Sequence, residues 1–125
     1  MSTRCVIGYR TPEDQVIYSY CHFDGYPSGV GAKLIARYNT EEAARQIASL
    51  HGFSSLEDTF EATKEEEYDD GGTLYGVMPY QQWRHTVDLF GCDYTYIWQC
   101  GGWFFTPQFS YDLQEVIDRD AAEDY

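Results

Sequence analysis

The chain has 125 residues, of which 43% are hydrophobic and 18% aromatic, as expected for one compact domain over residues 1–125. It contains no run of about 18 apolar residues and no apolar N-terminal stretch, so we predict neither a membrane span nor secretion, but a cytosolic protein. Its four cysteines are then expected to be reduced. No spacing of cysteines or histidines indicates a metal site, and no cofactor is expected.

The net charge is −13, and the acidic residues gather in two segments. Residues 1–56 are neutral, whereas residues 57–70 carry eight acids and one base, and residues 112–125 carry six acids and one base. Direct DNA or RNA binding is not expected, because it depends on lysines and arginines that neutralise phosphates. Concentrated acidity favours a basic partner protein, although it is also common in segments that only keep a protein in solution.

The first predicted elements are two strands, over residues 5–10 and 16–23. Both are rich in β-branched and aromatic residues, and they flank a turn-like segment at residues 11–15, which predicts an antiparallel hairpin. Neighbouring strand residues point to opposite faces of a sheet. His22 should therefore share a face with Tyr20.

Two helices are predicted next. Residues 32–38 have apolar side chains at helical spacing, and Ser28 is a plausible N-cap for this first helix. The second helix starts after Thr40, a capping residue type, and Gly52 is suited to end it. Lys33 is expected on the wetter face of the first helix.

The periodicity then fades into an acidic excursion over residues 57–72, in which we expect one short strand or turn around residues 59–63. A strand is predicted over residues 73–78, followed by a helix that begins at Pro79 and ends at Gly91. The acidic side chains of the excursion are the predicted partner-binding surface: Glu57, Asp58, Glu61, Glu65, Glu66, Glu67, Asp69 and Asp70.

The C-terminal part alternates in polarity over residues 93–99, and a glycine turn then leads into residues 103–106, which predicts a second hairpin. Residues 112–122 have helical spacing, and an acidic tail follows at about residues 118–125. Strands and helices are thus segregated. The predicted fold is α+β, with an antiparallel sheet of about four strands in two hairpins and three or four helices packed mainly on one face.

The densest set of chemically capable side chains lies in the loop at residues 20–31. Gly29 and Gly31 could let backbone N–H groups converge on an anion such as phosphate, with Lys33 beside them. The same glycines are also typical of a tight turn without a ligand. The candidate ligand-binding residues are His22, Asp24, Tyr26, Ser28, Gly29, Gly31 and Lys33.

Catalysis by this loop is the weaker alternative. His22 and Asp24 could form a general acid–base pair, but a histidine held by a carboxylate is more often structural. Cys21 and His22 point to opposite faces of a regular strand, so they cannot pair as a nucleophile and its base. We therefore predict no catalytic residue.

Four aromatic residues of the second hairpin, Tyr94, Tyr96, Trp98 and Trp103, have two interpretations. Aromatic stripes on adjacent strands can fill both faces of a hairpin and leave some rings exposed as partner contacts. The alternative is that all four build the core.

The string YCHFDGYPSGVG at residues 20–31 resembles the hallmark of a family of small phage and prophage proteins, in which it reads roughly Y-C-H-W-D-G-Y-P-S-x-x-G. The opening residues and the aromatic strand at residues 94–98 are also similar. The resemblance covers residues 1–56 and 91–106 but not the acidic excursion or the tail. Phe23 stands in place of the usual tryptophan. The family has no established activity, so it implies a mobile-element origin and no catalytic residues.

The resemblance implies a protein that acts in the cytosol of a host cell. Small acidic phage proteins often occupy a host protein, and an acidic surface that imitates nucleic acid is one physical route. We expect a phage-encoded inhibitor of a host defence protein, of the anti-CRISPR type, or of another basic nucleic-acid-handling protein. The alternatives are a protein that sequesters a small nucleotide-like ligand in the loop at residues 24–31, and a small enzyme that uses His22 and Asp24.

Overall fold

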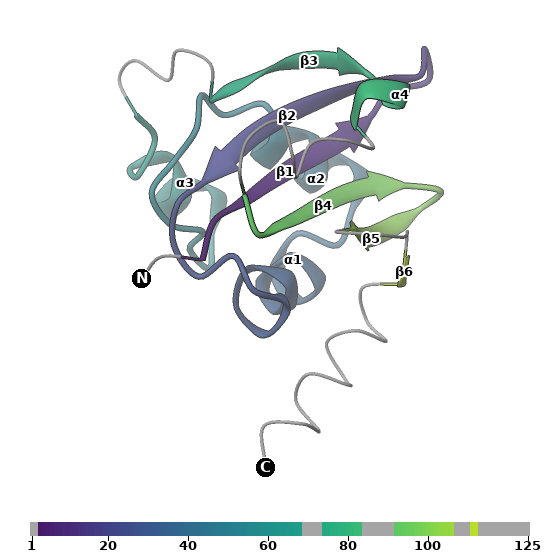
Figure 1. Cartoon of the computed structure of the whole chain (residues 1–125). Coiled ribbons are helices and arrows are strands. Elements are labelled where there is room, and N and C mark those ends of the chain that lie inside the picture. Colours follow the sequence, from purple (N-terminus) through teal and green to yellow (C-terminus); the bar gives the residue numbers. More distant parts are fainter. Residues whose placement is uncertain (1–2, 69–73, 84–91, 107–110, 113–125) are drawn as a thin grey trace.

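The computed structural model describes residues 3–68, 74–83, 92–106 and 111–112, which form an α+β fold (Figure 1). The helical segments are a π-helical turn η1 (Pro27–Gly31), α1 (Ala32–Arg37), α2 (Glu41–Ala48), α3 (Phe60–Lys64) and α4 (Tyr80–Trp83). The strands are β1 (Cys5–Arg10), β2 (Gln15–Cys21), β3 (Tyr75–Pro79), β4 (Tyr94–Gln99), β5 (Gly102–Thr106) and the two-residue β6 (Tyr111–Asp112). They make one sheet of order β3-β2-β1-β4-β5-β6.

Both predicted hairpins are confirmed. β1 and β2 pair antiparallel with Cys5 opposite Cys21, and β4 pairs antiparallel with β5. The second hairpin turns through Cys100 and Gly101, whose φ angles are 54° and 77°. Two positive φ values are the signature of a type I′ turn, which matches the twist of the flanking strands.

The prediction of an antiparallel sheet of about four strands is roughly correct but not exact. The sheet has six strands, and it is mixed, because β1 pairs with β4 in parallel, with Cys5 opposite Tyr94. A parallel pair needs a long crossover connection, and here the chain between β2 and β4 supplies it with its helices and β3. The strand predicted at residues 73–78 is β3, which pairs with β2 at the edge of the sheet.

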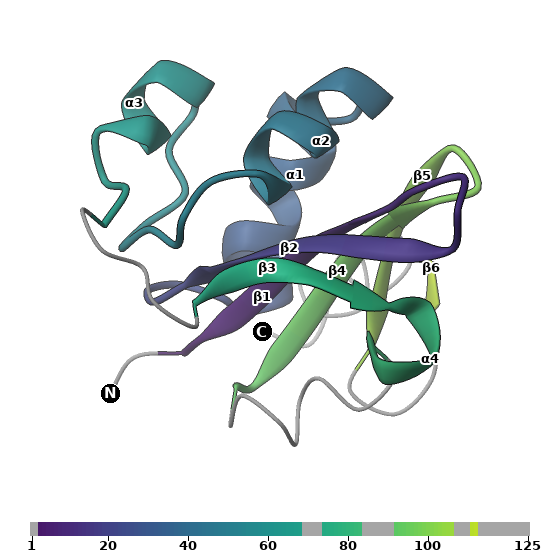
Figure 2. The ribbon, with the colours of Figure 1, turned by 90° about the horizontal axis from the view of Figure 1, so that it is seen from above.

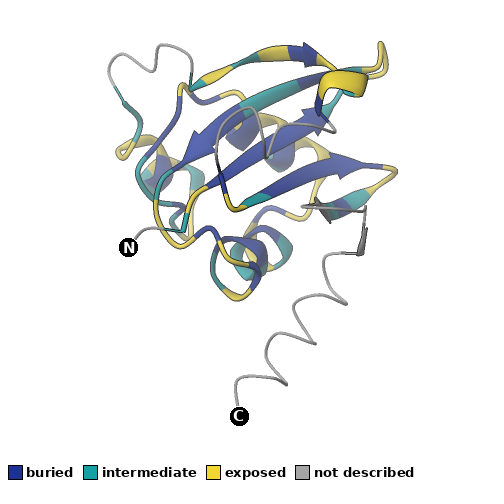
Figure 3. Ribbon diagram, viewed as in Figure 1, coloured by how far each residue is buried: buried dark blue, intermediate teal, exposed yellow. Residues whose placement is uncertain are grey.

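Each face of the sheet carries its own hydrophobic cluster. On one face, side chains of η1, α1 and α2 pack on β1, β2 and β4 around Ile7, Leu34, Ile47 and Tyr96. Figure 2 shows α1, α2 and α3 together on this side, which agrees with the prediction that the helices lie mainly on one face. On the other face Trp83 of α4 joins a smaller cluster. The central strands between the two clusters are buried (Figure 3).

Two local predictions are corrected. Ser28 is not an N-cap, because the helical region starts earlier, with Tyr26 at the cap position and Pro27 in the first turn. Residues 59–63 form no strand: Thr59 caps α3 by accepting a hydrogen bond from the backbone N–H of Ala62. The cap predicted at Thr40 is confirmed by its hydrogen bond from the Ala43 N–H.

Three predictions fall wholly or partly outside the described residues. The helix predicted from Pro79 is described only as α4, and its predicted end lies among residues 84–91. The last predicted helix and the acidic tail lie in residues 112–125, of which only residue 112 is described. None of the helices in the described ranges has the length and apolar character needed to span a membrane.

Candidate functional site

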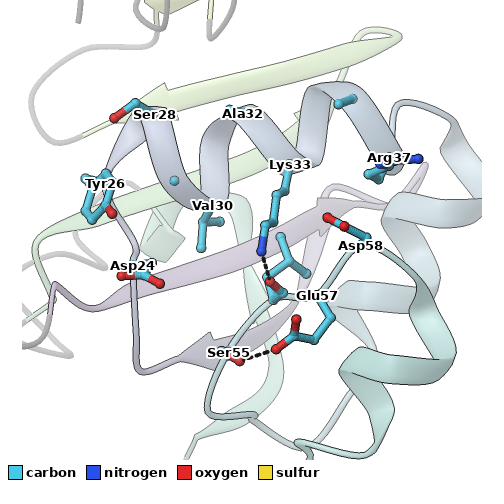
Figure 4. Close-up of a pocket in the computed structure, with 13 residues that line it drawn as sticks. Asp24, Tyr26, Ser28, Val30, Ala32, Lys33, Arg37, Ser55, Glu57 and Asp58 are labelled. Atoms are coloured by element: carbon cyan, nitrogen blue, oxygen red, sulfur yellow. Dashed lines mark hydrogen bonds between the residues drawn. The ribbon is translucent and has the colours of Figure 1, made fainter. Parts of the chain in front are cut away.

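A cleft of about 540 Å³ lies between two walls. One wall is the loop at residues 20–31, here called the hallmark loop, together with α1, and the other is the segment at residues 55–58. Figure 4 shows Asp24 and Tyr26 at one end, Glu57 and Asp58 at the other, and Lys33 reaching between them. Five of the seven loop residues predicted to bind a ligand line this cleft, namely Asp24, Tyr26, Ser28, Gly29 and Lys33. His22 and Gly31 are not among its lining residues.

The loop wall of the cleft is anchored to the core of the protein. The Gly25 N–H donates to the Thr3 carbonyl at 2.8 Å, and the buried Tyr96 hydroxyl donates to the Gly25 carbonyl at 2.6 Å. Asp24 has a φ of 58°, in the left-handed region that aspartate tolerates better than most residues. These contacts hold the exposed Asp24 side chain at the rim of the cleft.

Gly29 is required by close packing. Its N–H donates to the Tyr26 carbonyl at 2.9 Å, and a Cβ at this position would lie 2.5 Å from the Asp24 carbonyl oxygen and 2.9 Å from the Tyr26 ring. Gly31 is buried within η1. The close packing favours the tight-turn interpretation of Gly29 over a phosphate-binding one, and it places the Tyr26 ring against the backbone of the turn.

The opposite wall is tied to α1 by two side chains. The Lys33 ammonium donates to the Leu56 carbonyl at 2.9 Å, and the Tyr38 hydroxyl donates to the Glu57 carbonyl at 2.7 Å. The Thr63 hydroxyl oxygen lies 3.1 Å from the Tyr38 oxygen and accepts a hydrogen bond from the Glu57 N–H at 2.9 Å. Burial raises the pKa of Tyr38, which keeps this hydroxyl neutral and able to donate.

The charged side chains that line the cleft are three carboxylates and two cations. Asp24, Glu57 and Asp58 line the cleft together with Lys33 and Arg37. In the described parts of the chain the one salt bridge joins Arg10 to Asp14, at the remote β1–β2 turn. Because its three carboxylates outnumber its two cations, the cleft lining has a net negative charge. Lys33 and Asp24 are ligand residues that the sequence predicts, whereas Ser55 and Leu56 have no sequence signal and enter the cleft only through the tertiary fold.

The acidic segment continues from this wall. Three of its carboxylates hold local structure: Glu57 accepts from the Ser55 hydroxyl, Glu66 from the Ser54 hydroxyl, and Glu67 from the His51 N–H, each at 2.8 Å. The other described acids of the segment are exposed, and they are Asp58, Glu61 and Glu65. Asp69 and Asp70 lie outside the described residues.

His22 follows the last residue of β2 and lies beside Tyr20 of that strand, on the side that the alternation predicts. Its Nδ1 is 2.8 Å from the Tyr20 hydroxyl oxygen, and its ring meets Phe23 edge-on, with centroids 4.6 Å apart. Burial raises the pKa of Tyr20, so the phenol stays protonated. Asp24, predicted as its acid–base partner, lines the cleft, whereas His22 is not among the lining residues.

Burial makes Cys5 and Cys92 poor nucleophiles. Cys5, Cys21 and Cys92 are buried, and burial raises the pKa of Cys5 and raises that of Cys92 to about 11. Cys100 is exposed in the β4–β5 turn. Within the described ranges, no three His, Cys, Asp or Glu side chains come together as a metal site.

The aromatic residues of the second hairpin belong to the core. Tyr96, Trp98 and Trp103 are buried, and the half-buried Tyr94 packs against the same cluster. The Trp103 indole N–H also donates to the Tyr38 carbonyl at 3.1 Å. Tyr96, Trp98 and Trp103 are therefore core residues, which favours the core interpretation over exposed partner contacts for these three rings.

Comparison of the chain with family models, with curated proteins and with solved structures found no match.

Proposed function

We propose that this protein is a binding protein that occupies a basic surface of a partner protein through the acidic segment at residues 57–67. The observation that carries the proposal is uncompensated charge. The segment has six carboxylates and a single base, Lys64, and none of these carboxylates forms a salt bridge with any described residue. Glu57, Glu66 and Glu67 accept hydrogen bonds from neutral donors, which leave their negative charge uncompensated and able to attract an external cation.

A surface with uncompensated negative charge can contribute to the recognition of a basic protein. Uncompensated carboxylates create a negative potential that speeds encounter with a basic protein and orients it on approach. A protein that handles nucleic acid offers a matching surface, because its own ligand is a polyanion. The resemblance of residues 20–31 to a phage family supports a host partner of this kind, such as a defence protein inhibited in the anti-CRISPR manner.

The test is a pull-down from host lysate, at low and at high salt, with three forms of the tagged protein. These are the wild type, a variant with Glu61→Gln and Glu65→Gln, and a control with Glu13→Gln and Asp14→Asn. Both variants remove two exposed charges, but the control changes the remote β1–β2 turn. We expect a basic nucleic-acid-handling protein to be recovered by the wild type and the control, to be reduced with the acidic-segment variant, and to be lost at high salt.

Equal recovery of the partner by both variants would show that its binding does not depend on the acidic segment. Recovery that is unaffected by salt would exclude charge as the main attraction, because screening weakens contacts between exposed charges. Either result overturns the proposal.

A further inference from the structure

We propose that the cleft between residues 24–30 and 55–58 receives an arginine side chain of the basic partner. This inference rests on the proposed function and adds a specific contact to it. Glu57 and Asp58 are at once the first residues of the acidic segment and part of the cleft lining. A partner drawn to the segment would therefore meet the cleft at its edge.

The charge of the cleft selects a cation over an anion. Its lining has three carboxylates and two basic side chains, and the whole chain carries a charge of −13. Phosphate entering the cleft would meet Asp24, Glu57 and Asp58 as well as this overall negative field, whereas a basic side chain is attracted by both. One of the two cations, Lys33, is already engaged by the Leu56 carbonyl.

The shape of the groups in the cleft favours a guanidinium. Tyr26 exposes 39% of its surface, its ring packs against Gly29, and the Asp24 carboxylate lines the same end of the cleft. A planar guanidinium can stack on an aromatic ring while its edge donates hydrogen bonds to a carboxylate. A lysine ammonium offers neither the plane nor the paired donors.

The cleft is built before any partner arrives. The loop wall is held through Gly25 and Tyr96, and the facing wall through Lys33 and Tyr38. Its volume of about 540 Å³ lies within the range of clefts that bind small groups. A rigid site of this kind loses little conformational entropy on binding, which favours one defined contact over diffuse attraction.

The test measures binding of hexa-arginine and hexa-lysine to the full chain by calorimetry at a fixed salt concentration. We expect hexa-arginine to bind more tightly than hexa-lysine. Asp24→Asn keeps a residue that tolerates positive φ and removes the charge, and it should weaken hexa-arginine binding about fivefold. Asp14→Asn is its matched control, because Asp14 has a similar φ of 66° at the remote turn; it should change the dissociation constant less than twofold.

A second pair of variants tests the ring. Tyr26→Ala should weaken hexa-arginine binding about threefold and reduce the preference over hexa-lysine, since the stacking surface is lost. Tyr75→Ala removes a tyrosine of similar exposure, 37%, from β3, outside the cleft, and should have no such effect. Circular dichroism of each variant confirms that it is folded.

Three results would overturn the inference. Equal affinity for hexa-arginine and hexa-lysine would show that the cleft does not prefer a guanidinium. Equal effects of Asp24→Asn and Asp14→Asn would show that the peptide does not bind in the cleft. Tighter binding of ADP-ribose than of hexa-arginine, lost on Asp24→Asn or Tyr26→Ala, would instead make the cleft a nucleotide site. In each case the pull-down with the Glu61 and Glu65 variant still decides the proposed function by itself.

Discussion

Gly25 illustrates how one position can be dictated by its neighbours rather than by its own backbone angles. It is not among the glycines with a positive φ, which in the described ranges are Gly52, Gly76 and Gly101. A Cβ at Gly25 would nevertheless lie 2.8 Å from the Thr3 carbonyl oxygen and 2.9 Å from the Cys5 Cβ. The hallmark loop can therefore pass β1 only where no side chain is present.

Gly25→Ala should lower the free energy of unfolding by about 1–3 kcal/mol, because backbone atoms of residues 3 and 4 cannot move aside cheaply. Urea denaturation of the purified protein measures the loss. The matched control is Gly102→Ala, where nothing lies within 4 Å of the added Cβ. Equal stability of Gly25→Ala and the wild type would show that the loop shifts away from β1 without cost.

The acidic excursion contains a helix, α3, that its amino-acid composition did not predict. α3 has only five residues, too few for a hydrophobic period to be recognised in the sequence, and it forms because Thr59 caps its first turn. Thr63, which is fully buried, joins this helix to Glu57 and to Tyr38 at the end of α1. The negative charges of the segment are therefore mounted on a structure that is fixed to the helix layer.

Thr63→Val preserves the shape of the side chain but leaves the Glu57 N–H without its acceptor, which should cost about 1–3 kcal/mol. We expect faster amide hydrogen exchange over residues 55–67 and little change in β1. Ser49→Ala is the control, since it removes an exposed hydroxyl that donates to the Arg45 carbonyl. Unchanged exchange at Glu57 would mean that the hydrogen bond does not hold the segment in place.

For the whole molecule, charge works against folding while it favours recognition. A net charge of −13 on 125 residues produces self-repulsion in the compact state. Little internal pairing offsets this repulsion, because Arg10–Asp14 is the one salt bridge among the described residues and lies at the surface. Both proposals depend on this excess of negative charge, which the binding of a basic partner would reduce.

The melting temperature should rise when NaCl is raised from about 10 mM to about 150 mM, because the screening length shortens from roughly 30 Å to roughly 8 Å. Glu61→Gln with Glu65→Gln should show a smaller rise, since two of the repelling charges are gone. Potassium chloride should give the same result as sodium chloride if screening is the cause. A melting temperature that falls with salt would mean that attractive pairs dominate.

Periodicity and turn chemistry in the sequence were sufficient to predict both hairpins, the first two helices, the Thr40 cap and the α+β class, because each of these depends on neighbours within a few residues. The parallel pairing of β1 with β4 could not be predicted, since pairing across 89 positions, as between Cys5 and Tyr94, is decided by how the sheet and helices pack.

The candidate site divides in the same way. Its loop wall was recognisable from the residue types at Asp24, Tyr26 and Lys33. Glu57 and Asp58 of its facing wall were predicted as partner-binding acids, but not as neighbours of this loop. Hydrogen bonds from Lys33 to the Leu56 carbonyl, from Tyr38 to the Glu57 carbonyl and from the Phe23 N–H to the Ser54 carbonyl hold this wall in place, and no local pattern in the sequence indicates them. The two walls of the cleft come from segments that are distant in the sequence, and only the packing of the folded chain brings these segments to within hydrogen-bonding distance.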